Sequence, residues 1–581
     1  MPPSQDAASL TQLGVIGVIL LVVLFYGGTM IMSVAISKKK ENADAYMTAG
    51  NQIGFGVSAA SMTATWIWAA SMYASVTAGY TYGVSGPLHY GLWGALMILF
   101  IYPFGRRIRA VAPRAHTLAE VMYARHGRSS QLMLAGSNVL GSVISLTSNF
   151  IAGGALISLL SPLSFGAGIL IVAAGVLLYT LWSGFRASVL TDFAQVMAML
   201  GATVIIIPAV FFAAGGPDMF QAGVEAGHVT AQQQSFFSSD AFMNQGAPYI
   251  AAVLAYAIGN QTIAQRLFAV REDLIKPTFV TATLGYGGTV IGVGMLGVMA
   301  LYLGVEPLDG GVNNLLPQMV ADHLPLALVA LAFLMIIGSL SSTADSDLSA
   351  LSSIVMTDVY GQSVGRKSAD PKTMLLIGRI TMIVATAAAL YFATAKFDIL
   401  DLLVFVGALW GCLVFPVIAS FYWGTITNVA FTVSVLAALA VFLPVRFEWF
   451  PLEGAWAFAV ETLAILGVGV VLGIMCFGFF GLRPAVVVGA IASVVMLFLG
   501  YGFLRDYATL TGSLVAYAVS FLVCWGLSVR SGQDFDFDRI ARVTGDFDPA
   551  TEDLPQVQLV SIARGFFADW AAARREGGSI I

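Results

Sequence analysis

Residues 463–477 read LAILGVGVVLGIMCF, an apolar run without a charged residue. A similar run, ILIVAAGVLLY, covers residues 169–179. A transmembrane β-strand would alternate apolar and polar residues, whereas both of these runs are continuously apolar. Continuous apolar runs of this kind are typical of helices that are buried or lie in a membrane. The two runs therefore predict an all-α protein.

The composition of the whole chain indicates that lipid replaces water around much of its surface. Of the 581 residues, 58% are hydrophobic and only 10% are charged, whereas a soluble domain usually has about 25% charged residues. Apolar runs recur along the chain, and a run of roughly 18 or more residues can span a bilayer as a helix. The sequence therefore predicts a polytopic α-helical membrane protein with the lipid bilayer as its partner.

We expect about fifteen transmembrane helices. The predicted spans are residues 13–35, 55–80, 88–105, 133–160, 164–183, 189–214, 247–268, 275–303, 325–358, 374–395, 399–424, 427–444, 455–478, 482–503 and 508–529. Lys38–Lys40 and the arginines between residues 106 and 128 fall in inner segments, while the outer loops contain only Lys396, Arg446 and Arg505. Because positive residues prefer the cytoplasmic side, we expect the N-terminus outside and the C-terminus in the cytoplasm, in the plasma (inner) membrane.

Two of the predicted spans are interrupted by polar or small residues. The second contains SMTATWIWAAS at residues 61–71, and the seventh contains YAIGNQT at residues 256–262. These spans open two successive blocks of five helices, and interrupted helices at matching positions of two halves point to a transporter binding site. The alternative is that both stretches make ordinary polar contacts between helices.

Residues 338–347, GSLSSTADSD, form the densest polar cluster inside a predicted span. Ionisable groups in a bilayer cost about 2.5–3.5 kcal/mol, so they mark sites. By helical spacing, four hydroxyl residues share one face: Ser339, Ser342, Thr343 and Ser346. Such oxygens suit hard cations such as Na⁺. A close contact between helices is the alternative for the hydroxyl residues alone, but the carboxylates of Asp345 and Asp347 favour an ion site.

Several function classes find no support in the sequence. The chain contains no P-loop, no GxSxG and no His-rich metal motif, so ATP-driven pumping and membrane hydrolysis are not predicted. We expect no separate soluble catalytic domain and therefore no enzyme. The net charge of −5 comes without a basic domain, which argues against nucleic acid as a partner.

Four stretches together resemble the sodium:solute symporter family. They are TLAEVMYARHG at residues 117–127, GFRASVLTD at 184–192, NQTIAQR at 260–266, and the ninth-span run through TDVY at 357–360. The resemblance covers about residues 10–530, and the combination is specific although each stretch is weak alone.

The resemblance implies an inverted five-helix repeat of the amino-acid-transporter type, with extra helices at both ends. Residues 1–54 would hold the N-terminal extra helix and an inner loop, and residues 55–214 the first repeat. Residues 247–424 would form the second, inverted repeat and residues 427–529 the C-terminal extra helices. Residues 530–581 would be a cytoplasmic tail.

The resemblance also implies ion sites. One Na⁺ would lie between the second and ninth spans, with five ligand residues: the hydroxyls of Ser342 and Thr343, the carbonyl of Ser339, and carbonyls near Thr65 and Trp68. A second cation would use Asp192, Asp345 and Ser346. Asp345 replaces the usual hydroxyl residue there, so a proton is the alternative to a second Na⁺. Spacing alone favours a helix N-cap as the role of Asp192.

Within the family, WIW at residues 66–68, YGVSGP at 82–87 and APRAHT at 112–117 look most like the urea-transporter branch. This resemblance implies urea or a similar small, uncharged amide. Its N–H groups would bond to Asp347, where that branch usually has Glu, and to Gln261, and its oxygen would accept from Asn260. The planar walls would come from Trp66, Trp68 and Tyr73. The alternative is that these aromatic rings only pack against neighbouring helices.

The sequence therefore favours Na⁺-coupled import of a small polar solute by alternating access, with H⁺ as an alternative ion. A passive channel and a membrane-embedded solute sensor remain alternatives, as do an amino acid, a sugar or a carboxylate as the solute. The oligomeric state does not follow from the sequence.

Overall fold

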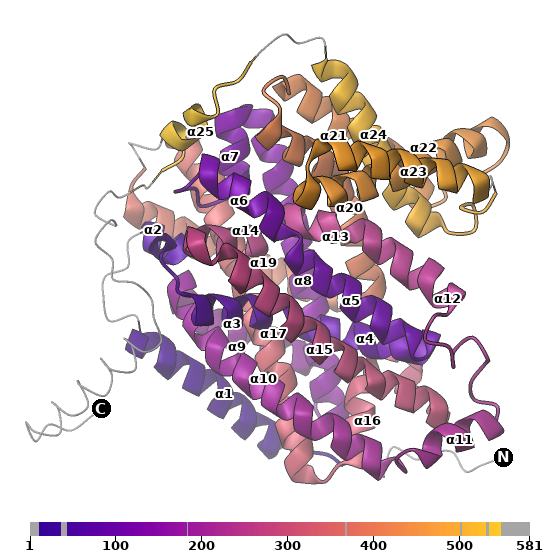
Figure 1. The fold of residues 1–581 in the computed structure, drawn as a ribbon. Helices are drawn as coiled ribbons and strands as arrows, with labels where there is room; N and C mark the ends of the chain where they lie inside the picture. Colours follow the sequence, from indigo (N-terminus) through magenta and orange to yellow (C-terminus); the bar gives the residue numbers. More distant parts are fainter. Residues whose placement is uncertain are drawn as a thin grey trace, which may run out of the picture.

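The computed structural model describes residues 11–36, 43–182, 184–365, 369–499, 502–529, 534–545 and 547. Within these ranges the protein is helical (Figure 1), and the β-structure consists of an isolated bridge between Ile53 and Val270. The predicted all-α fold is therefore confirmed for this part of the chain. The inner-loop lysines 38–40 and most of the predicted tail, residues 530–581, lie outside the described residues.

Twelve helical segments in the described ranges are long and apolar enough to cross a membrane. They are α1 (Gly14–Ile36), the pair α5 (Ser85–Leu99) and α6 (Ile101–Val111), α8 (Arg128–Leu160), α10 (Phe185–Ala213), α15 (Ile275–Leu303), α17 (Leu326–Ile354, extended by a π-helical turn, Val355–Gly361), α19 (Pro371–Ala393), α20 (Ile399–Tyr422), α21 (Asn428–Arg446), α22 (Gly454–Phe480), α23 (Leu482–Leu499) and α24 (Ala508–Ser528). The protein is thus a multi-pass membrane protein.

Three of the fifteen predicted spans do not meet that criterion, each for a physical reason. The span predicted at 164–183 is α9 (Phe165–Trp182), whose apolar segment Phe165–Leu181 lies at the lower limit of length for a span. The spans predicted at 55–80 and 247–268 are each divided into two helices. The total of fifteen therefore stays a prediction.

The second predicted span consists of α3 (Phe55–Trp66) and α4 (Ala69–Tyr82). Helical geometry ends at Ile67 (φ −80°, ψ 64°), and the following Trp68 is extended (φ −81°, ψ 155°). Two buried residues, Ile67 and Trp68, therefore depart from helical geometry, so carbonyls of the last turn of α3 lose their helical donors and need other partners.

The seventh predicted span is divided in a similar way, into α13 (Ala247–Gly259) and α14 (Gln261–Ala269). Asn260 between them is extended, and its side chain accepts from the N–H of Thr262, 2.8 Å away. Asn260 thus acts as the N-cap of α14. Both interruptions in the sequence correspond to breaks in the structure.

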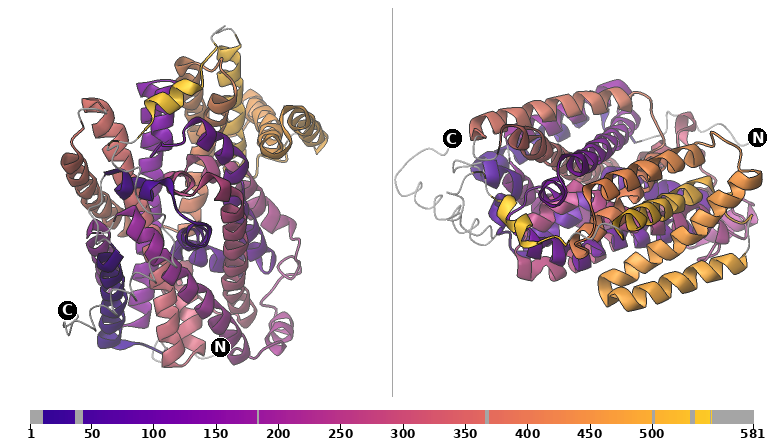
Figure 2. Two further views of the ribbon diagram at one scale, coloured as in Figure 1. Left: turned by 60° about the vertical axis from the view of Figure 1, so that its left-hand side comes forward. Right: turned by 90° about the horizontal axis from the view of Figure 1, so that it is seen from above.

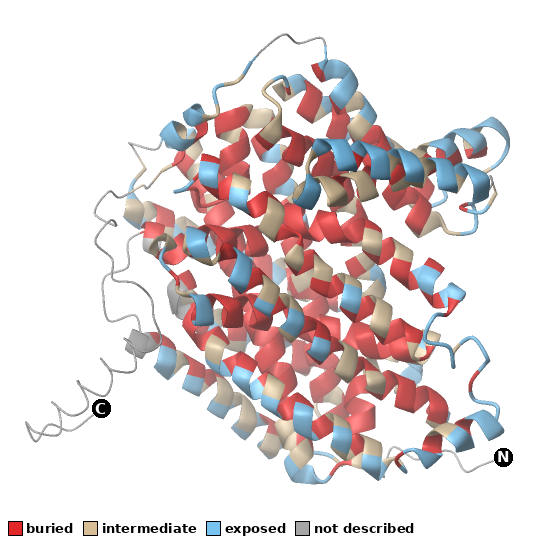
Figure 3. Ribbon diagram, in the orientation of Figure 1, coloured by how far each residue is buried: buried red, intermediate tan, exposed pale blue. Residues whose placement is uncertain are grey.

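The helices pack into one body, and a hairpin of α22 and α23 projects from its side (Figure 2). Figure 3 shows a buried centre, whereas α1 and α23 at the periphery are largely exposed. Beyond Arg483 in its first turn, α23 exposes apolar side chains, for example Val486, Ile491 and Phe498. Such a surface fits the hydrocarbon of a bilayer and would be unfavourable in water.

The short helices α2 (Ala43–Thr48), α7 (Leu118–Arg125) and α25 (Asp538–Val543) lie at one end of the molecule, and α11 (Asp218–Glu225) and α16 (Leu315–His323) lie at the opposite end (Figure 1). The described C-terminal residues dock at the first end. There the guanidinium of Arg125 lies 4.0 Å from the ring centre of Phe535 and donates to the carbonyl of Trp423 (3.0 Å).

Candidate functional site

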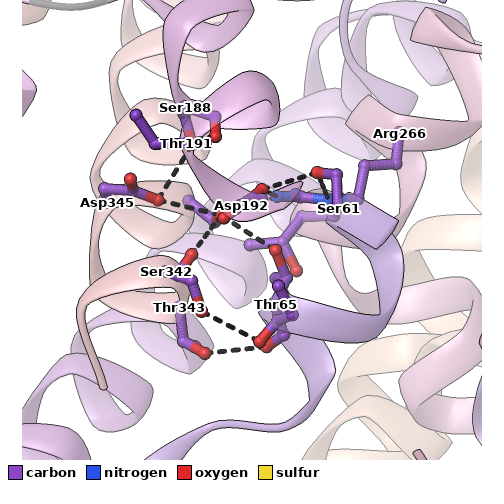
Figure 4. A network of polar contacts seen from close by, with 12 residues as sticks. Ser61, Thr65, Ser188, Thr191, Asp192, Arg266, Ser342, Thr343 and Asp345 are labelled. Atoms are coloured by element: carbon purple, nitrogen blue, oxygen red, sulfur yellow. Dashed lines mark hydrogen bonds and ion pairs between the residues drawn. The ribbon is translucent and has the colours of Figure 1, made fainter. Parts of the chain in front are cut away.

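The hydroxyl-rich face of α17 lies directly against the break between α3 and α4 (Figure 4). The last helical hydrogen bond of α3 joins the Ile67 N–H to the carbonyl of Thr63 (2.8 Å). The carbonyls of Ala64, Thr65 and Ile67 accept from α17 instead. Ser342 Oγ donates to the carbonyl of Ala64 (2.9 Å), and Thr343 Oγ1 donates to the carbonyl of Thr65 (2.7 Å).

Three further oxygens complete this cluster, two from Ser339 and one from Ile67. The carbonyl of Ser339 lies 3.1 Å from Ser342 Oγ and 3.4 Å from Thr343 Oγ1. The hydroxyl of Ser339 donates to the carbonyl of Ile67. The cluster therefore gathers hydroxyl and carbonyl oxygens from two helices in a buried place. All of these groups are neutral, and their dipoles suit a hard monovalent cation such as Na⁺.

The structure brings most of the predicted ligand residues together, with a different register at the break, and their role as ion ligands stays a prediction. Ser339, Ser342, Thr343 and Thr65 come together. The carbonyl of Trp68 instead accepts from the N–H of Met72 (3.1 Å), in the first turn of α4. The sequence did not identify Ala64 and Ile67, whose carbonyls face α17. Helix breaks free carbonyls in general, but the spacing of side chains does not fix which ones.

Asp192 on α10 forms a buried ion pair with Arg266 on α14 (Figure 4). Arg266 Nη2 lies 3.1 Å from Asp192 Oδ2 and 2.7 Å from Ser346 Oγ, and Arg266 Nε lies 3.0 Å from Ser61 Oγ. Ser61 Oγ also donates to Asp192 Oδ2 (2.6 Å). A guanidinium is thus held where the sequence predicted a second cation, and Arg266 itself was not among the predicted site residues.

Asp345 lies beside that pair, and its carboxylate accepts from three hydroxyl groups. Its Oδ2 accepts from Tyr179 (2.9 Å), and its Oδ1 accepts from Ser188 (2.9 Å) and Ser346 (3.2 Å). The Ser346 hydroxyl lies 3.1 Å from the hydroxyl of Thr65. The carbonyl of Thr65 belongs to the oxygen cluster between α17 and the break of α3–α4. The two predicted ion sites are therefore joined by one chain of hydrogen bonds.

The predicted solute residues do not all face one place. Asn260 caps α14, and Gln261 holds a loop: its Oε1 accepts from the N–H of Leu118 (3.2 Å), and its Nε2 donates to the carbonyl of His116 (3.0 Å). Asp347 faces α8, where Ser145 Oγ donates to its Oδ2 (2.5 Å). In this conformation Asn260 and Gln261 thus serve the backbone around the second break.

Aromatic rings bridge the two helix breaks. Trp66 lies beside Trp68 (ring centres 6.4 Å apart) and edge-to-face with Tyr256 (6.0 Å), which in turn contacts Trp410 of α20 (5.0 Å). The predicted wall residue Tyr73 is buried, and its hydroxyl has no hydrogen-bond partner among the described residues. An unpaired buried hydroxyl is unfavourable, so a polar group that reached Tyr73 would gain a hydrogen bond there.

Trp410 closes this row of rings, and the sequence did not single it out. Its indole N–H donates to the carbonyl of Ser137 on α8 (3.2 Å). A Cβ added at Gly141 would lie 2.1 Å from the Trp410 ring, and one added at Gly259 would lie 2.7 Å from it. The indole is therefore wedged between the backbones of α8 and α13, next to the second break.

A buried histidine lies behind α14, in the loop before α7. His116 Nε2 is 2.8 Å from Asp44 Oδ1, and its Nδ1 is 3.5 Å from Glu120 Oε2. Burial alone would lower the pKa of His116, but the hydrogen bond to Asp44 and the nearby carboxylate of Glu120 raise it to about 9. The backbone N–H of Phe547 also donates to Asp44 Oδ1 (2.8 Å).

This geometry predicts a loss of stability at alkaline pH. The His116 pKa is raised from about 6.5 in the unfolded chain to about 9. Its contribution is therefore complete below about pH 6.5 and is lost as the pH rises through 9. We expect a loss of up to about 3 kcal/mol, seen as a lower thermal unfolding temperature of the purified protein at pH 9.5 than at pH 6.5.

The variant His116→Asn should flatten that pH dependence. His228→Asn is a matched control, because the His228 ring contacts a backbone carbonyl, that of Tyr302 (2.9 Å). An equal slope in wild type and His116→Asn would contradict the assignment.

The chain is similar to a known family and to known proteins in sequence and in fold. The profile of the sodium:solute symporter family matches residues 46–434. The probable urea active transporter 1 of Schizosaccharomyces pombe is 25% identical over 427 residues, 68% of this chain and 64% of that transporter. The sodium/pantothenate symporter of Escherichia coli is 30% identical over 254 residues, 42% of this chain and 52% of that symporter.

A solved structure of a Na⁺-coupled sialic acid symporter in a substrate-bound, outward-open state has a similar fold. It matches with a TM-score of 0.62 at 18% identity, over 82% of this chain and 97% of that one. By name, these relatives are transporters or symporters of urea, pantothenate and sialic acid. From the family profile and the relatives together, the chain belongs to the sodium:solute symporter family.

Proposed function

We propose that this protein is a Na⁺-coupled symporter that imports a small polar solute, with urea as the first candidate, by alternating access. The observation that carries the proposal is the oxygen cluster between α17 and the break of α3–α4. It offers the hydroxyls of Ser342 and Thr343 and the carbonyls of Ala64, Ile67 and Ser339 to one cation.

Coupling follows from where the cluster lies. Its ligands come from two helices, so a cation bound between them favours the conformation in which α17 and the broken helix are close together. A solute bound at the same break gains from that conformation, and each ligand then strengthens the binding of the other. One Na⁺ moving down a potential of 100 mV contributes about 2.3 kcal/mol to this process.

A second cation at Asp192, Asp345 and Ser346 remains part of the proposal, with a condition. Arg266 contacts Asp192 and Ser346 in the present conformation, so a second Na⁺ would enter only after the guanidinium has moved. If it stays, Arg266 takes the place of that ion, and Asp345 with its hydroxyl partners is the candidate carrier of a proton.

Urea is supported by the relatives and by the site chemistry. Several relatives carry the name urea active transporter. Trp66 and Trp68 provide flat surfaces at the first break, and the unpaired hydroxyl of Tyr73 and the carboxylate of Asp347 provide hydrogen-bonding groups. A site that pairs the donors and acceptor of urea would reject analogues that leave such groups unpaired.

The test is uptake into proteoliposomes with and without an inward Na⁺ gradient. We expect labelled urea to accumulate only with the gradient, excess unlabelled urea to block this uptake, and thiourea and acetamide to compete less well. Proline, a sugar and a carboxylate in the same panel examine the alternative solutes. Na⁺-driven uptake of one of these without urea uptake would remove urea but keep the symporter.

The same assay separates the alternative functions. A passive channel would equilibrate the solute without accumulating it, and a sensor would move none. Repeating the assay with a pH gradient in place of the Na⁺ gradient tests coupling to protons.

A further inference from the structure

A polar pocket lies away from the helix breaks, at the end of the molecule where α13, α20 and α24 begin. Its volume is about 280 Å³. Its walls come from the end of α4, the π-helical turn Phe242–Gly246, the first turns of α13 and α20, the end of α21 and the start of α24. The sequence predicts that this end faces outside, and none of the residues assigned to the ion sites lines the pocket.

Two hydrogen-bond donors at this pocket are buried without a partner. Gln245 is only 2% exposed, and its Nε2 has no hydrogen-bond partner among the described residues. The Nε of Arg446 is likewise buried and has no hydrogen-bond partner among the described residues. Both side chains line the pocket. An unpaired buried donor costs about 1–3 kcal/mol, and a ligand with an acceptor oxygen would remove that cost.

The start of α24 adds further donors to the same wall. The N-cap residue Tyr507 provides no side-chain hydrogen bond to the helix, and the first-turn residues Ala508, Thr509 and Leu510 line the pocket. The first amides of a helix lack intrahelical acceptors and carry a partial positive charge. They therefore favour the same kind of oxygen as Gln245 and Arg446.

Acceptors complete the lining. Three exposed carboxylates belong to the same pocket: Asp401, Glu448 and Asp506. Carboxylates accept hydrogen bonds from N–H groups. The pocket thus combines donors for an acceptor oxygen with acceptors for N–H groups, which matches the two ends of an amide or of an amino acid.

The pocket adjoins the row of rings that bridges the helix breaks. Val404 lines it, and the carbonyl of the preceding Leu403 accepts from the hydroxyl of Tyr256 (2.6 Å). Tyr256 is the ring that contacts both Trp66 and Trp410. The helix α20 that lines the pocket through Val404 therefore also carries Trp410 and receives the hydrogen bond of Tyr256.

We propose that this pocket is a second solute site, in which a small molecule with an acceptor oxygen and N–H groups binds before it passes the Tyr256–Trp410 pair. This role rests on the proposed symporter function, because the solute held here is the one transported. A neutral amide and an amino acid share the required chemistry, so urea, acetamide and proline are the probes.

The test combines Gln245→Leu with Arg446→Met, which removes both unpaired donors and keeps side chains of similar size. For the solute that wild type transports, we expect KM to rise five- to twentyfold, while the maximal rate and the Na⁺ dependence stay within twofold. Gln221→Leu is the matched control, because Gln221 on α11 is exposed and bonds to Glu225 instead (2.8 Å). A damaged fold would lower the maximal rate and the yield of folded protein instead of raising KM.

A labelling experiment tests the pocket without transport. In a Cys476→Ala background, Thr509→Cys places a thiol in the lining, and a membrane-impermeant maleimide reports its accessibility. Urea, acetamide or proline should slow the labelling, and adding Gln245→Leu should abolish this protection. Protection without Na⁺-driven uptake would support the pocket while rejecting the symporter. An unchanged KM in the double variant, or no protection by any of the three probes, would overturn the proposal.

Discussion

Replacing Ser342 and Thr343 together with alanine is expected to raise the Na⁺ concentration for half-maximal uptake at least tenfold. The change removes two of the oxygens gathered at the break of α3–α4, those 2.9 and 2.7 Å from the carbonyls of Ala64 and Thr65. Tenfold corresponds to about 1.4 kcal/mol. The measurement is the Na⁺ dependence of solute uptake in proteoliposomes at fixed membrane potential.

Ser341→Ala is the control for this experiment. Ser341 lies on the same helix and is equally buried, but its hydroxyl donates to that of Tyr26 (3.1 Å) on α1. It should leave the Na⁺ dependence unchanged. If the double variant also leaves it unchanged, the ion does not bind at this cluster.

Breaking the ion pair between Asp192 and Arg266 is expected to have the second large effect. Both side chains are buried, and removal of one partner leaves the other charge uncompensated, at a cost of about 3–5 kcal/mol. We expect Asp192→Asn and Arg266→Gln each to lower the yield of folded protein and its unfolding temperature. The double variant, which leaves no buried charge of this pair, should recover much of the loss.

The same variants decide between Arg266 and a second Na⁺. If Arg266 holds the place of that ion, Asp192→Asn in the double variant should not change the number of charges that enter with each solute. If Na⁺ binds at Asp192, then Asp192→Asn alone should fold normally and lower the Na⁺:solute ratio, measured as current against labelled uptake. That result would contradict the role given to Arg266.

The sequence was informative where helical periodicity determines the outcome. Ser339, Ser342 and Thr343 share a face because they follow helical spacing, and that face lies on the first break. The breaks themselves were readable from polar and small residues inside apolar runs. The register of the first break was not, since it depends on where Ile67 leaves helical geometry, and so Ala64 and Ile67 were missed.

Side-chain contacts between helices that are far apart in the sequence could not be predicted from helical spacing. Arg266 belongs to a charged segment that the topology places inside, and nothing in its spacing indicates that its side chain turns back to Asp192. Gln261 was predicted to bind the solute, yet its amide holds the loop around His116. Side-chain direction at a break depends on the local backbone, which periodicity does not describe.

The wedge of Trp410 also makes the protein suitable for spectroscopy. Its indole is fixed by the backbones at Gly141 and Gly259, so any separation of α8 from α13 must change the surroundings of this one ring. In protein grown with 5-fluorotryptophan, the ten tryptophans would each give a ¹⁹F resonance, and Trp410→Phe would identify the resonance of this ring. Its chemical shift would then follow the exchange between conformations as Na⁺ and solute are added, in the intact protein and without an attached label.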